Sequence, residues 1–467
     1  MDFVVIGGDA AGMSAASRAK RNRPDLNVTV LEKTGDVSYS ACGMPYNIAE
    51  PDMDIEDLVV RHAQVFRDKQ GINLLTGHCA EELSPGDKTV SGRTSEGKVF
   101  HLSYDKLLIA TGASPVMPDI PGTELPGVIP LKTLDDGRKI KAFIKDRRVR
   151  RVVLIGMGYI ALEMCEALRA MDIQADMVKS RPTFLPWMNA DMAEVIREEL
   201  ESNGVVLHPG HALERIEASD DGLKLICPDL TLDADMILPA MGVTPNSELA
   251  ANAGIITGIG NSIAVDTGLR TSDENVFAAG DCADAVHVVT GEKTWIPLAL
   301  RANRGGWAVA DNVCGKDVRV HGTVGTAVFK VFDLQVARAG LNAAEATKAG
   351  FDPAEVMIRS RSRAHAHPGA SKIWVQMVGD KKTGCLLGVQ MLGKEGVAHR
   401  INAAAVALHA RMTVEQFSQS DMAYAPPFGP VWDPLLTAAN QLLRKIWSMG
   451  GRLCYFIFIV EKLEIRF

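Results

Sequence analysis

Two stretches of the chain share one hydrophobic and polar pattern: a short apolar run, a glycine-rich turn and then small residues spaced as in a helix. The first run is Phe3–Ile6, and the helix after it is predicted from about Met13 to Arg21. The second run ends at Ile155, and a helical pattern follows its turn. A strand, a tight glycine turn and a helix set a dinucleotide pyrophosphate on the helix N-terminus, so the pattern predicts two dinucleotide sites.

The first turn runs from Gly7 to Gly12, and the next strand, Val28–Leu31, ends at Glu32. A carboxylate in that place suits a ribose hydroxyl. Asp9 stands where the pattern usually has its middle glycine, and its side chain limits how closely a pyrophosphate can approach. Taken alone, this stretch also fits an ordinary turn after a strand.

The second turn keeps the spacing of small residues intact, with Gly156, Gly158 and Ala161. The strand that follows ends at Lys179-Ser180-Arg181 instead of an acid. Cations there suit a ribose 2′-phosphate, which favours NADPH over NADH. The alternative is that they are solvated surface cations.

Two further apolar runs end in small residues. Leu107–Ile109 closes on Ala110-Thr111-Gly112, and a short strand near residue 277 closes on Gly280-Asp281. At the carboxyl end of a strand in such a sheet, Asp281 could accept hydrogen bonds from hydroxyl groups of a ligand. Plain turns are the alternative for both.

The pattern changes from about residue 325. Strands are predicted at 326–332, 372–378 and 385–392, and a helix at 395–410, with no glycine-rich phosphate loop. This favours a third module of the α+β class that binds no nucleotide of its own. The apolar run 453–460 is too short to span a bilayer, and it suggests an extra strand, an interface or non-native sequence.

Composition narrows the class of protein. A chain of 467 residues should form about three domains, and 47% hydrophobic with 23% charged residues is typical of soluble globular proteins. The net charge of −7 favours neither nucleic acid nor an anionic membrane as a partner. Eight cysteines without a CxxC pair argue against a disulfide scaffold or a metal site. With no basic leader before the first strand, we expect a cytoplasmic protein.

One cysteine stands out. Cys42 lies among small residues, and Gly43 and Pro45 fix an irregular backbone just before a helical pattern. A helix N-terminus favours the thiolate, so Cys42 is predicted to be reactive. The alternative is a small buried residue, and the flanking nucleotide motifs favour the reactive interpretation.

With these motifs in this order, and with Tyr424-Ala425-Pro426-Pro427 near the end, residues 1–440 resemble the pyridine nucleotide-disulfide oxidoreductase flavoproteins. Within that class the sequence is similar to the single-cysteine coenzyme A-disulfide reductases and to CoA-persulfide or polysulfide reductases. The resemblance implies an α/β fold with two Rossmann-like domains and a C-terminal α+β dimerisation domain. The implied division is an FAD domain at 1–112 and 248–324, an NAD(P) domain at 113–247, a dimerisation domain at 325–445 and a tail of unknown role at 446–467.

The resemblance also implies the cofactor contacts. Tyr159 resembles a residue that covers the flavin, and Glu163 one that faces it. The implied FAD contacts are Gly7, Gly12, Glu32, Lys33, Ala110, Thr111, Gly112, Asp281, Leu298 and Ala299. The implied NAD(P) contacts are Gly156, Gly158, Tyr159, Ile160, Glu163, Lys179 and Arg181.

Dithiol members of the class have a second cysteine five positions after the first, where this chain has Asn47. Cys42 is therefore expected to form a mixed disulfide with a small thiol or persulfide, or a sulfenic acid with peroxide. The implied enzyme is an FAD-dependent homodimer that uses NADPH or NADH to reduce CoA-disulfide, CoA-persulfide or polysulfide, with coenzyme A bound or disulfide-linked to Cys42. Tyr424 of the second subunit, with His367 in place of a frequent tyrosine, is expected to protonate the leaving sulfur.

Arg18, Arg21 and Arg61 are candidates for the acidic ADP end of coenzyme A, and solvated helix cations are the alternative. Ser38 and Asn47 are further candidates for contacts to coenzyme A. Two other functions stay open from the sequence. One is an NAD(P)H oxidase or peroxidase that cycles Cys42 through a sulfenic acid, and the other is a redox-responsive flavin-binding protein that acts by docking to a partner.

Overall fold

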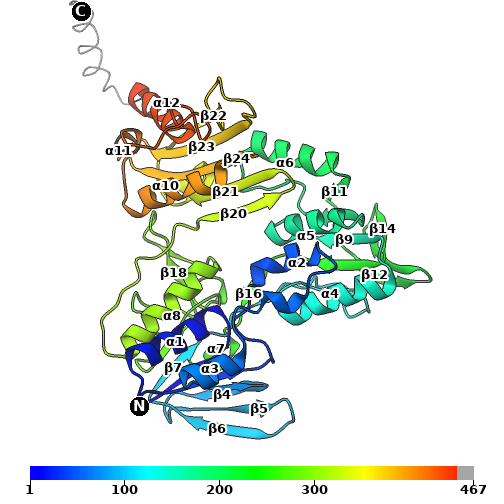
Figure 1. Cartoon of the computed structure of the whole chain (residues 1–467), viewed down its shortest axis with the longest axis vertical. Coiled ribbons are helices and arrows are strands. Elements are labelled where there is room, and N and C mark those ends of the chain that lie inside the picture. The colour runs from blue at the N-terminus through cyan, green and yellow to red at the C-terminus, as the bar shows by residue number, and fades with distance from the viewer. Residues whose placement is uncertain (450–467) are drawn as a thin grey trace, which may run out of the picture. The chain divides into compact units, whose positions relative to one another are not determined.

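The computed structural model describes residues 1–449, and this part of the chain forms two compact units (Figure 1). The first unit holds residues 1–184, 204–287 and 292–323. The second holds residues 185–203, 288–291 and the described residues from Val324 onward. Across residues 1–449, no helix is long and apolar enough to cross a membrane.

The first unit contains a five-stranded sheet in the order β17-β7-β1-β2-β3, in which every pair is parallel. Its strands are β1 (Asp2–Ile6), β2 (Asn27–Glu32), β3 (Asn73–Thr76), β7 (Lys106–Ile109) and β17 (Val276–Ala278). The predicted strand, turn and helix at the N-terminus are confirmed, but helix α1 (Ala10–Asn22) begins before Met13. The first turn of α1 consists of alanine and glycine residues, whose small side chains do not crowd the glycine turn that precedes the helix.

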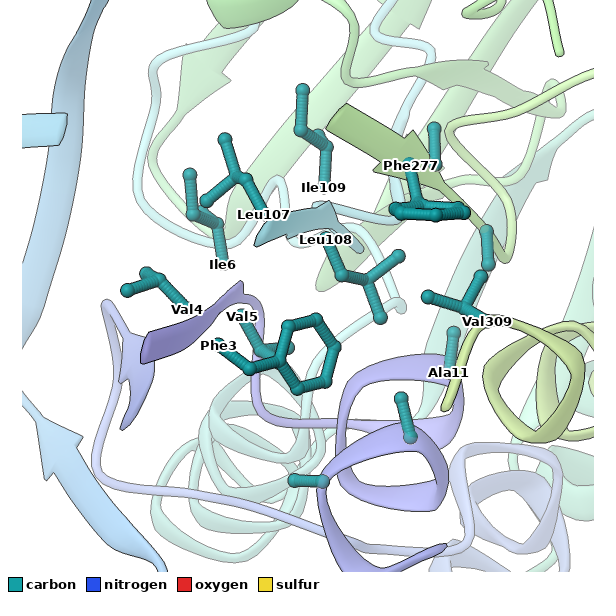
Figure 2. Packing of buried hydrophobic residues seen from close by; sticks show 14 of the residues in the cluster. Phe3, Val4, Val5, Ile6, Ala11, Leu107, Leu108, Ile109, Phe277 and Val309 are labelled. Carbon is teal, nitrogen blue, oxygen red and sulfur yellow. The ribbon is translucent and has the colours of Figure 1, made fainter. Parts of the chain in front are cut away.

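The core of this sheet is built from large side chains on the strands and small ones on the helices (Figure 2). Phe3 and Leu108 are fully buried, and Val309 packs in the same cluster from helix α8 (Ala299–Val313). Burying a side chain of this size contributes roughly 1.5–3 kcal/mol. Helix α1 packs closely on α8, since a Cβ at Gly306 would lie 2.2 Å from the carbonyl oxygen of Ala11.

A second parallel sheet in the same unit has the order β11-β10-β9-β15. Its strands are β9 (Arg151–Ile155), β10 (Gln174–Lys179), β11 (Val205–Pro209) and β15 (Met236–Pro239). Helix α5 (Tyr159–Ala170) connects β9 to β10, as α1 connects β1 to β2. The two predicted strand, turn and helix units are therefore both present, and both lie in parallel sheets.

Smaller elements complete the first unit. Two antiparallel sheets have three strands each, namely β4 (His78–Ser84), β5 (Thr89–Thr94) and β6 (Val99–Ser103), and β12 (Arg215–Ser219), β13 (Gly222–Ile226) and β14 (Thr231–Ala234). Two strand pairs are β8 (Ala113–Pro115) with β16 (Val243–Pro245), and β18 (Ala285–Val286) with β19 (Lys293–Thr294). The remaining helices are η1 (Ala41–Gly43), α2 (Met44–Ile48), η2 (Ile55–Leu58), α3 (Ala63–Gln70), α4 (Leu134–Arg147), α7 (Glu248–Asn252) and η3 (Ile259–Asn261).

The second unit is built on an antiparallel sheet in the order β20-β21-β24-β23-β22. Its strands are β20 (Ala327–Val331), β21 (Leu334–Gly340), β22 (Pro353–Arg361), β23 (Lys372–Asp380) and β24 (Leu386–Gly393). Its helices are α6 (Ala190–Ser202), α9 (Ala343–Lys348), α10 (Val397–His409), α11 (Val414–Ser418) and α12 (Pro434–Met449). The α+β prediction is confirmed, but β21 and β22 were not predicted from the sequence. The expected boundary at residue 445 falls inside α12, and the apolar run 453–460 lies outside the described residues.

Residues 185–203 belong to the second unit, although the sequence placed them within 113–247. Hydrogen bonds to its sheet explain this membership. The carbonyl oxygen of Trp187 accepts from the side-chain amides of Asn342 and Gln390, at 3.0 and 2.8 Å. The backbone N–H of Asn189 donates to the other end of the Gln390 side chain. These polar contacts are invisible to a hydrophobic pattern.

Candidate active site

Two glycine turns give the clearest test of whether dinucleotides fit this chain. Gly7 has φ +112°, and a Cβ there would lie 2.2 Å from the carbonyl oxygen of Ala110. Gly156 has φ +122°, and a Cβ there would lie 2.3 Å from the carbonyl oxygen of Ala240. Only glycine fits either turn. At Gly158, by contrast, a Cβ would meet nothing within 4 Å, so the space before α5 is open to a pyrophosphate.

Glu32 ties the end of β2 to the first turn. One carboxylate oxygen accepts from the backbone N–H of Gly8 at 2.7 Å, and the other accepts from the backbone and hydroxyl of Thr34, both at 2.8 Å. An ionised carboxylate offers about four acceptor positions. Three of these positions are used by donors from the chain, so one remains for a ribose hydroxyl. Glu32 therefore fits the role expected for it at the end of β2.

Asp9 precedes α1 and makes no side-chain cap to that helix. Burial raises its pKa to about 6, against the opposing effects of a hydrogen bond from the backbone of Tyr39 and the charge of Lys132. The carboxylates of Glu32 and Asp281 raise it further. In its protonated form the side chain is uncharged and can donate a hydrogen bond, so Asp9 is compatible with an anionic group at this turn.

Asp281 lies just after β17, at the carboxyl end of the strand, as predicted. Its carboxylate accepts from the ammonium of Lys132 at 3.2 Å, and its carbonyl oxygen accepts from the Trp295 indole at 2.7 Å. Lys132 thus places a positive charge between Asp281 and Asp9. No role was predicted for this lysine, because no sequence motif contains it.

Arg301 fixes the backbone around Asp281. Its guanidinium, half-buried on α8, donates to four backbone carbonyl oxygens, those of Gly280, Ala283, Asp284 and Ile296, at 2.8–3.1 Å. The arginine thus ties the loop from Gly280 to Asp284 to the segment just before α8. It was also missed from the sequence, although it lies close to the predicted Leu298 and Ala299.

The remaining predicted flavin contacts lie on turns and at a helix start. Helix α8 begins at Ala299, and Leu298 before it makes no side-chain cap, so the first N–H groups of the helix are available to a ligand. The hydroxyl of Thr111 donates to the carbonyl oxygen of Asn246 at 2.6 Å, and the Asn246 amide donates back to the Thr111 carbonyl. This pair fixes the turn that contains Ala110 and Gly112. Lys33 is exposed.

Cys42 lies in η1 and directly precedes α2, in the irregular segment that Gly43 and Pro45 predicted. The residue is exposed, and all seven cysteines of the described chain are free thiols. The pKa of Cys42 is raised, first by desolvation of the thiol and then by the carboxylate of Glu163. The charge of Lys132 opposes this rise. Helix α2, which follows η1, has only five residues.

Tyr46, on the same segment, donates a hydrogen bond of 2.8 Å from its hydroxyl to Glu163 on α5. This contact brings together the Cys42 segment and the helix of the second glycine turn, as α2 packs on α5. Tyr159 at the start of α5 is 37% exposed, and Ile160 is half-buried. Glu163 was predicted as a site residue from the sequence, but Tyr46 was not. The two residues are far apart in the chain, and no local pattern reveals that they form a hydrogen bond.

The cations predicted for a 2′-phosphate lie at the end of β10. The ammonium of Lys179 donates to the carbonyl oxygen of Thr183 at 2.9 Å, and Arg181 is exposed. Burial and then the charge of Arg181 lower the pKa of Lys179. An anion bound beside Lys179 would favour its charged form, so the end of β10 suits a phosphate.

The candidates for coenzyme A differ in availability. Arg18 forms a bidentate pair with Asp311, at 3.0 and 2.7 Å, and lies over the ring of Trp307. Asn47 is buried, and its side-chain oxygen accepts from Lys141 at 3.0 Å. Both side chains therefore have hydrogen-bond partners within the chain. The other candidates, Arg21, Ser38 and Arg61, are exposed or half-buried.

Tyr424 and His367 belong to the second unit, whereas Cys42 belongs to the first. Tyr424 is 48% exposed, and a ring nitrogen of His367 lies 3.0 Å from the carbonyl oxygen of Pro368. The backbone N–H of Ala364 donates to the carbonyl oxygen of Pro426, which joins the two loops. Within residues 1–449, no group of three or more His, Cys, Asp or Glu residues could hold a metal ion.

Comparison with known proteins identifies the class. Residues 1–306 match the family described as pyridine nucleotide-disulphide oxidoreductase, and residues 326–434 match the dimerisation domain of the same family. The chain belongs to this family. It is therefore an oxidoreductase that uses FAD and a pyridine nucleotide, and the glycine turns described above fit these cofactors.

Three relatives of this oxidoreductase are informative. It is 38% identical over 440 residues to the CoA-dependent NAD(P)H sulfur oxidoreductase of Pyrococcus abyssi, covering 94% of this chain and 97% of that protein. It is 31% identical over 447 residues to an NADH oxidase of Methanocaldococcus jannaschii, covering 96% and 99%. The solved NAD-dependent persulfide reductase of A. fulgidus superposes with a TM-score of 0.92 at 35% identity, covering 96% of this chain and 84% of that one.

Proposed function

We propose that this oxidoreductase reduces the sulfur–sulfur bond of coenzyme A disulfide, coenzyme A persulfide or polysulfide at Cys42. The observation that supports this most directly is an exposed thiol between two dinucleotide turns, with Asn47 where a second cysteine would stand. A relative named as a CoA-dependent sulfur oxidoreductase supports the same substrate class.

The chemistry follows from a lone thiol. The Cys42 thiolate attacks one sulfur of the substrate, which forms a mixed disulfide and releases the other sulfur as a thiolate or hydrosulfide. The bound cofactors supply the two electrons that cleave the mixed disulfide and regenerate Cys42. For coenzyme A disulfide the balance is one NAD(P)H and one proton consumed for two thiols, and for the persulfide it is one thiol and one hydrogen sulfide.

The chain's own residues position this reaction. Gly43 and Pro45 set the backbone of Cys42, and Lys132 is the one cation among the charged groups that act on its thiol. For FAD we propose Gly7, Gly12, Glu32, Lys33, Ala110, Thr111, Gly112, Asp281, Leu298 and Ala299. For the pyridine nucleotide we propose Gly156, Gly158, Tyr159, Ile160, Glu163, Lys179 and Arg181, the last two selecting NADPH.

We further propose a homodimer in which Tyr424 and His367 of one subunit protonate the sulfur that leaves at Cys42 of the other. The match of residues 326–434 to a dimerisation domain supports it. So does the exposure of Tyr424, Phe428 and Trp432 on one segment, at 48%, 78% and 62%. Free thiols at every described cysteine fit a reducing compartment such as the cytoplasm.

A second candidate is an NAD(P)H oxidase or peroxidase, which the relatives named NADH oxidase favour. Peroxide would convert the Cys42 thiolate to a sulfenic acid and hydroxide, and two electrons with two protons would return the thiol and release the oxygen as water.

Turnover of coenzyme A disulfide and of polysulfide without oxygen, compared with peroxide as the only acceptor, separates the two candidates. The mass of the purified protein adds a second test. A coenzyme A adduct on Cys42 supports the first function, and fast peroxide turnover without any disulfide turnover contradicts it.

A further inference from the structure

The hydrogen bond from Tyr46 to Glu163 connects the Cys42 segment to a carboxylate on α5. Tyr46 lies on α2, four positions after Cys42, and its hydroxyl donates to Glu163 at 2.8 Å. A phenol that donates to a carboxylate stabilises the charged form of that carboxylate. The bond therefore holds a negative charge at the Cys42 segment.

The charge on Glu163 results from opposing effects. Burial raises its pKa, the hydrogen bond from Tyr46 lowers it, and the carboxylate of Glu166 on the same helix raises it. Burial and the bond to Glu163 raise the pKa of Tyr46, so the phenol keeps its proton and stays the donor. The hydrogen bond from Tyr46 thus favours the ionised form of Glu163, whereas burial and the charge of Glu166 favour its protonated form.

Glu163 has the largest effect among the charged groups that act on Cys42. Asp281 and Asp9, from the turns after β17 and β1, act in the same direction but less strongly. Lys132, from the segment before α4, acts in the opposite direction. Desolvation is the largest cause of the raised pKa of Cys42, and among the charged groups the Glu163 carboxylate adds most to it.

We propose that Tyr46 and Glu163 form a positioning pair that controls the charge of Cys42. The Tyr46 hydroxyl keeps the Glu163 carboxylate ionised and directed at the cysteine segment, and that carboxylate opposes the thiolate. Neither residue touches the substrate in this role. The pair acts only through the proton on the sulfur.

This control has a chemical consequence that rests on the proposed function. A more basic thiolate is a stronger nucleophile, although a smaller fraction of it is present at neutral pH. The pair therefore lowers the fraction of Cys42 that is ionised at neutral pH and raises the nucleophilicity of the thiolate that forms. After the mixed disulfide is cleaved, the same carboxylate favours return of a proton to Cys42, which completes the reaction with the thiol restored.

The test measures the thiolate directly. Purified flavin-loaded protein is alkylated with iodoacetamide from pH 6 to 10, and the rate at Cys42 is followed by mass spectrometry of its peptide. Glu163→Gln removes the charge, so the profile should move to lower pH and the rate at neutral pH should rise on the order of three- to tenfold.

Tyr46→Phe removes only the hydroxyl. Glu163 then stays protonated to a higher pH, so alkylation should be faster than in the wild type over the pH range in which Glu163 is protonated only in the variant. At high pH, where Glu163 is ionised in both proteins, the two profiles should meet. Asp172→Asn is the matched control, since it makes the same carboxylate-to-amide change at an exposed residue of φ +57°, a conformation that asparagine tolerates.

An unchanged profile in Glu163→Gln overturns the proposal, as does a shift of equal size in Asp172→Asn. A Tyr46→Phe profile identical to the wild type at every pH overturns the role of Tyr46. If Glu163→Gln fails to fold with its flavin, Tyr46→Phe still decides the question. Because alkylation needs no substrate, failure of this proposal and failure of the proposed disulfide reduction are observed separately.

Discussion

Tyr46 and Glu163 are 117 positions apart in the chain and are joined by a hydrogen bond of 2.8 Å. Tyr46 lies on α2, shortly after Cys42, and Glu163 lies on α5, the helix that follows the second glycine turn. A hydrogen bond to a charged group contributes about 1.5–3 kcal/mol. The position of the cysteine segment therefore depends on the element that is predicted to bind the pyridine nucleotide.

The first prediction concerns Cys42. Cys42→Ser should lower turnover of coenzyme A disulfide at least about a thousandfold, since a hydroxyl is a far weaker nucleophile than a thiolate at neutral pH. The flavin absorbance should stay unchanged. Cys79→Ser is the control, because Cys79 is also exposed but lies on β4. Disulfide turnover that survives in Cys42→Ser contradicts the proposed function.

Asp9→Asn should stabilise the protein at pH 7. The pKa of Asp9 is raised to about 6 by burial, so between pH 4 and 6 the folded state holds a proton that the unfolded state has lost. The free energy of unfolding therefore falls as the pH rises through this window. Asparagine avoids this loss, with a gain on the order of 1–3 kcal/mol at pH 7 that disappears below about pH 4.

Thermal unfolding of both proteins across that pH range measures the difference. Asparagine is also a favourable residue before a helix, so no new strain is introduced at α1. An equal gain at pH 3 and pH 7 would show that titration of Asp9 is not its cause.

Arg301→Met should destabilise the loop around Asp281 and weaken flavin binding. Methionine keeps the approximate length of the side chain but removes the four hydrogen bonds to backbone carbonyl oxygens, at a cost of roughly 3 kcal/mol or more. Flavin release during dialysis and the unfolding temperature measure both effects. Arg304→Met, on an exposed position of the same helix, should change neither. Equal flavin retention in the two variants would contradict this role of Arg301.

Lys179→Ala combined with Arg181→Ala should raise the KM for NADPH by roughly tenfold or more and leave the KM for NADH nearly unchanged. Each lost charge-assisted hydrogen bond to a phosphate contributes about 1.5–3 kcal/mol, partly offset by solvent at this exposed site. Steady-state kinetics with both nucleotides measures the ratio. Arg147→Ala, an exposed cation on α4, serves as control. A parallel loss with both nucleotides would instead indicate a structural role.

The sequence predicted those features that depend on local pattern. The two glycine turns, Glu32 at the end of β2 and Asp281 after β17 were all found, because backbone conformation and strand ends leave a signature within a few residues. The pattern missed β21 and β22, whose residues carry no turn signal as strong as a glycine-rich loop. Side-chain amides such as that of Gln390 tie residues 187 and 189 to the second unit, and no local pattern in the sequence reveals such contacts.

The site was harder to predict than the fold. Lys132, Tyr46 and Arg301 act through partners that are distant in sequence, so only the folded chain reveals them. Two candidates for coenzyme A, Arg18 and Asn47, proved to be occupied by Asp311 and Lys141. The pKa of Cys42 is raised first by desolvation and then by the carboxylate of Glu163, which lies on another element and could not be placed beside the thiol from the sequence.

The pairing of β17 with β7 affects how this protein is made. Phe277 pairs with Leu108, so the first sheet gains its last strand only after the whole second sheet has been synthesised. Until then a nascent chain exposes the open edge of β7, which can pair wrongly with another chain. Ribosomes add about 5–20 residues per second, so this edge waits for many seconds. Slower translation between the two strands should therefore raise the demand for chaperones, even though each sheet is stable once complete.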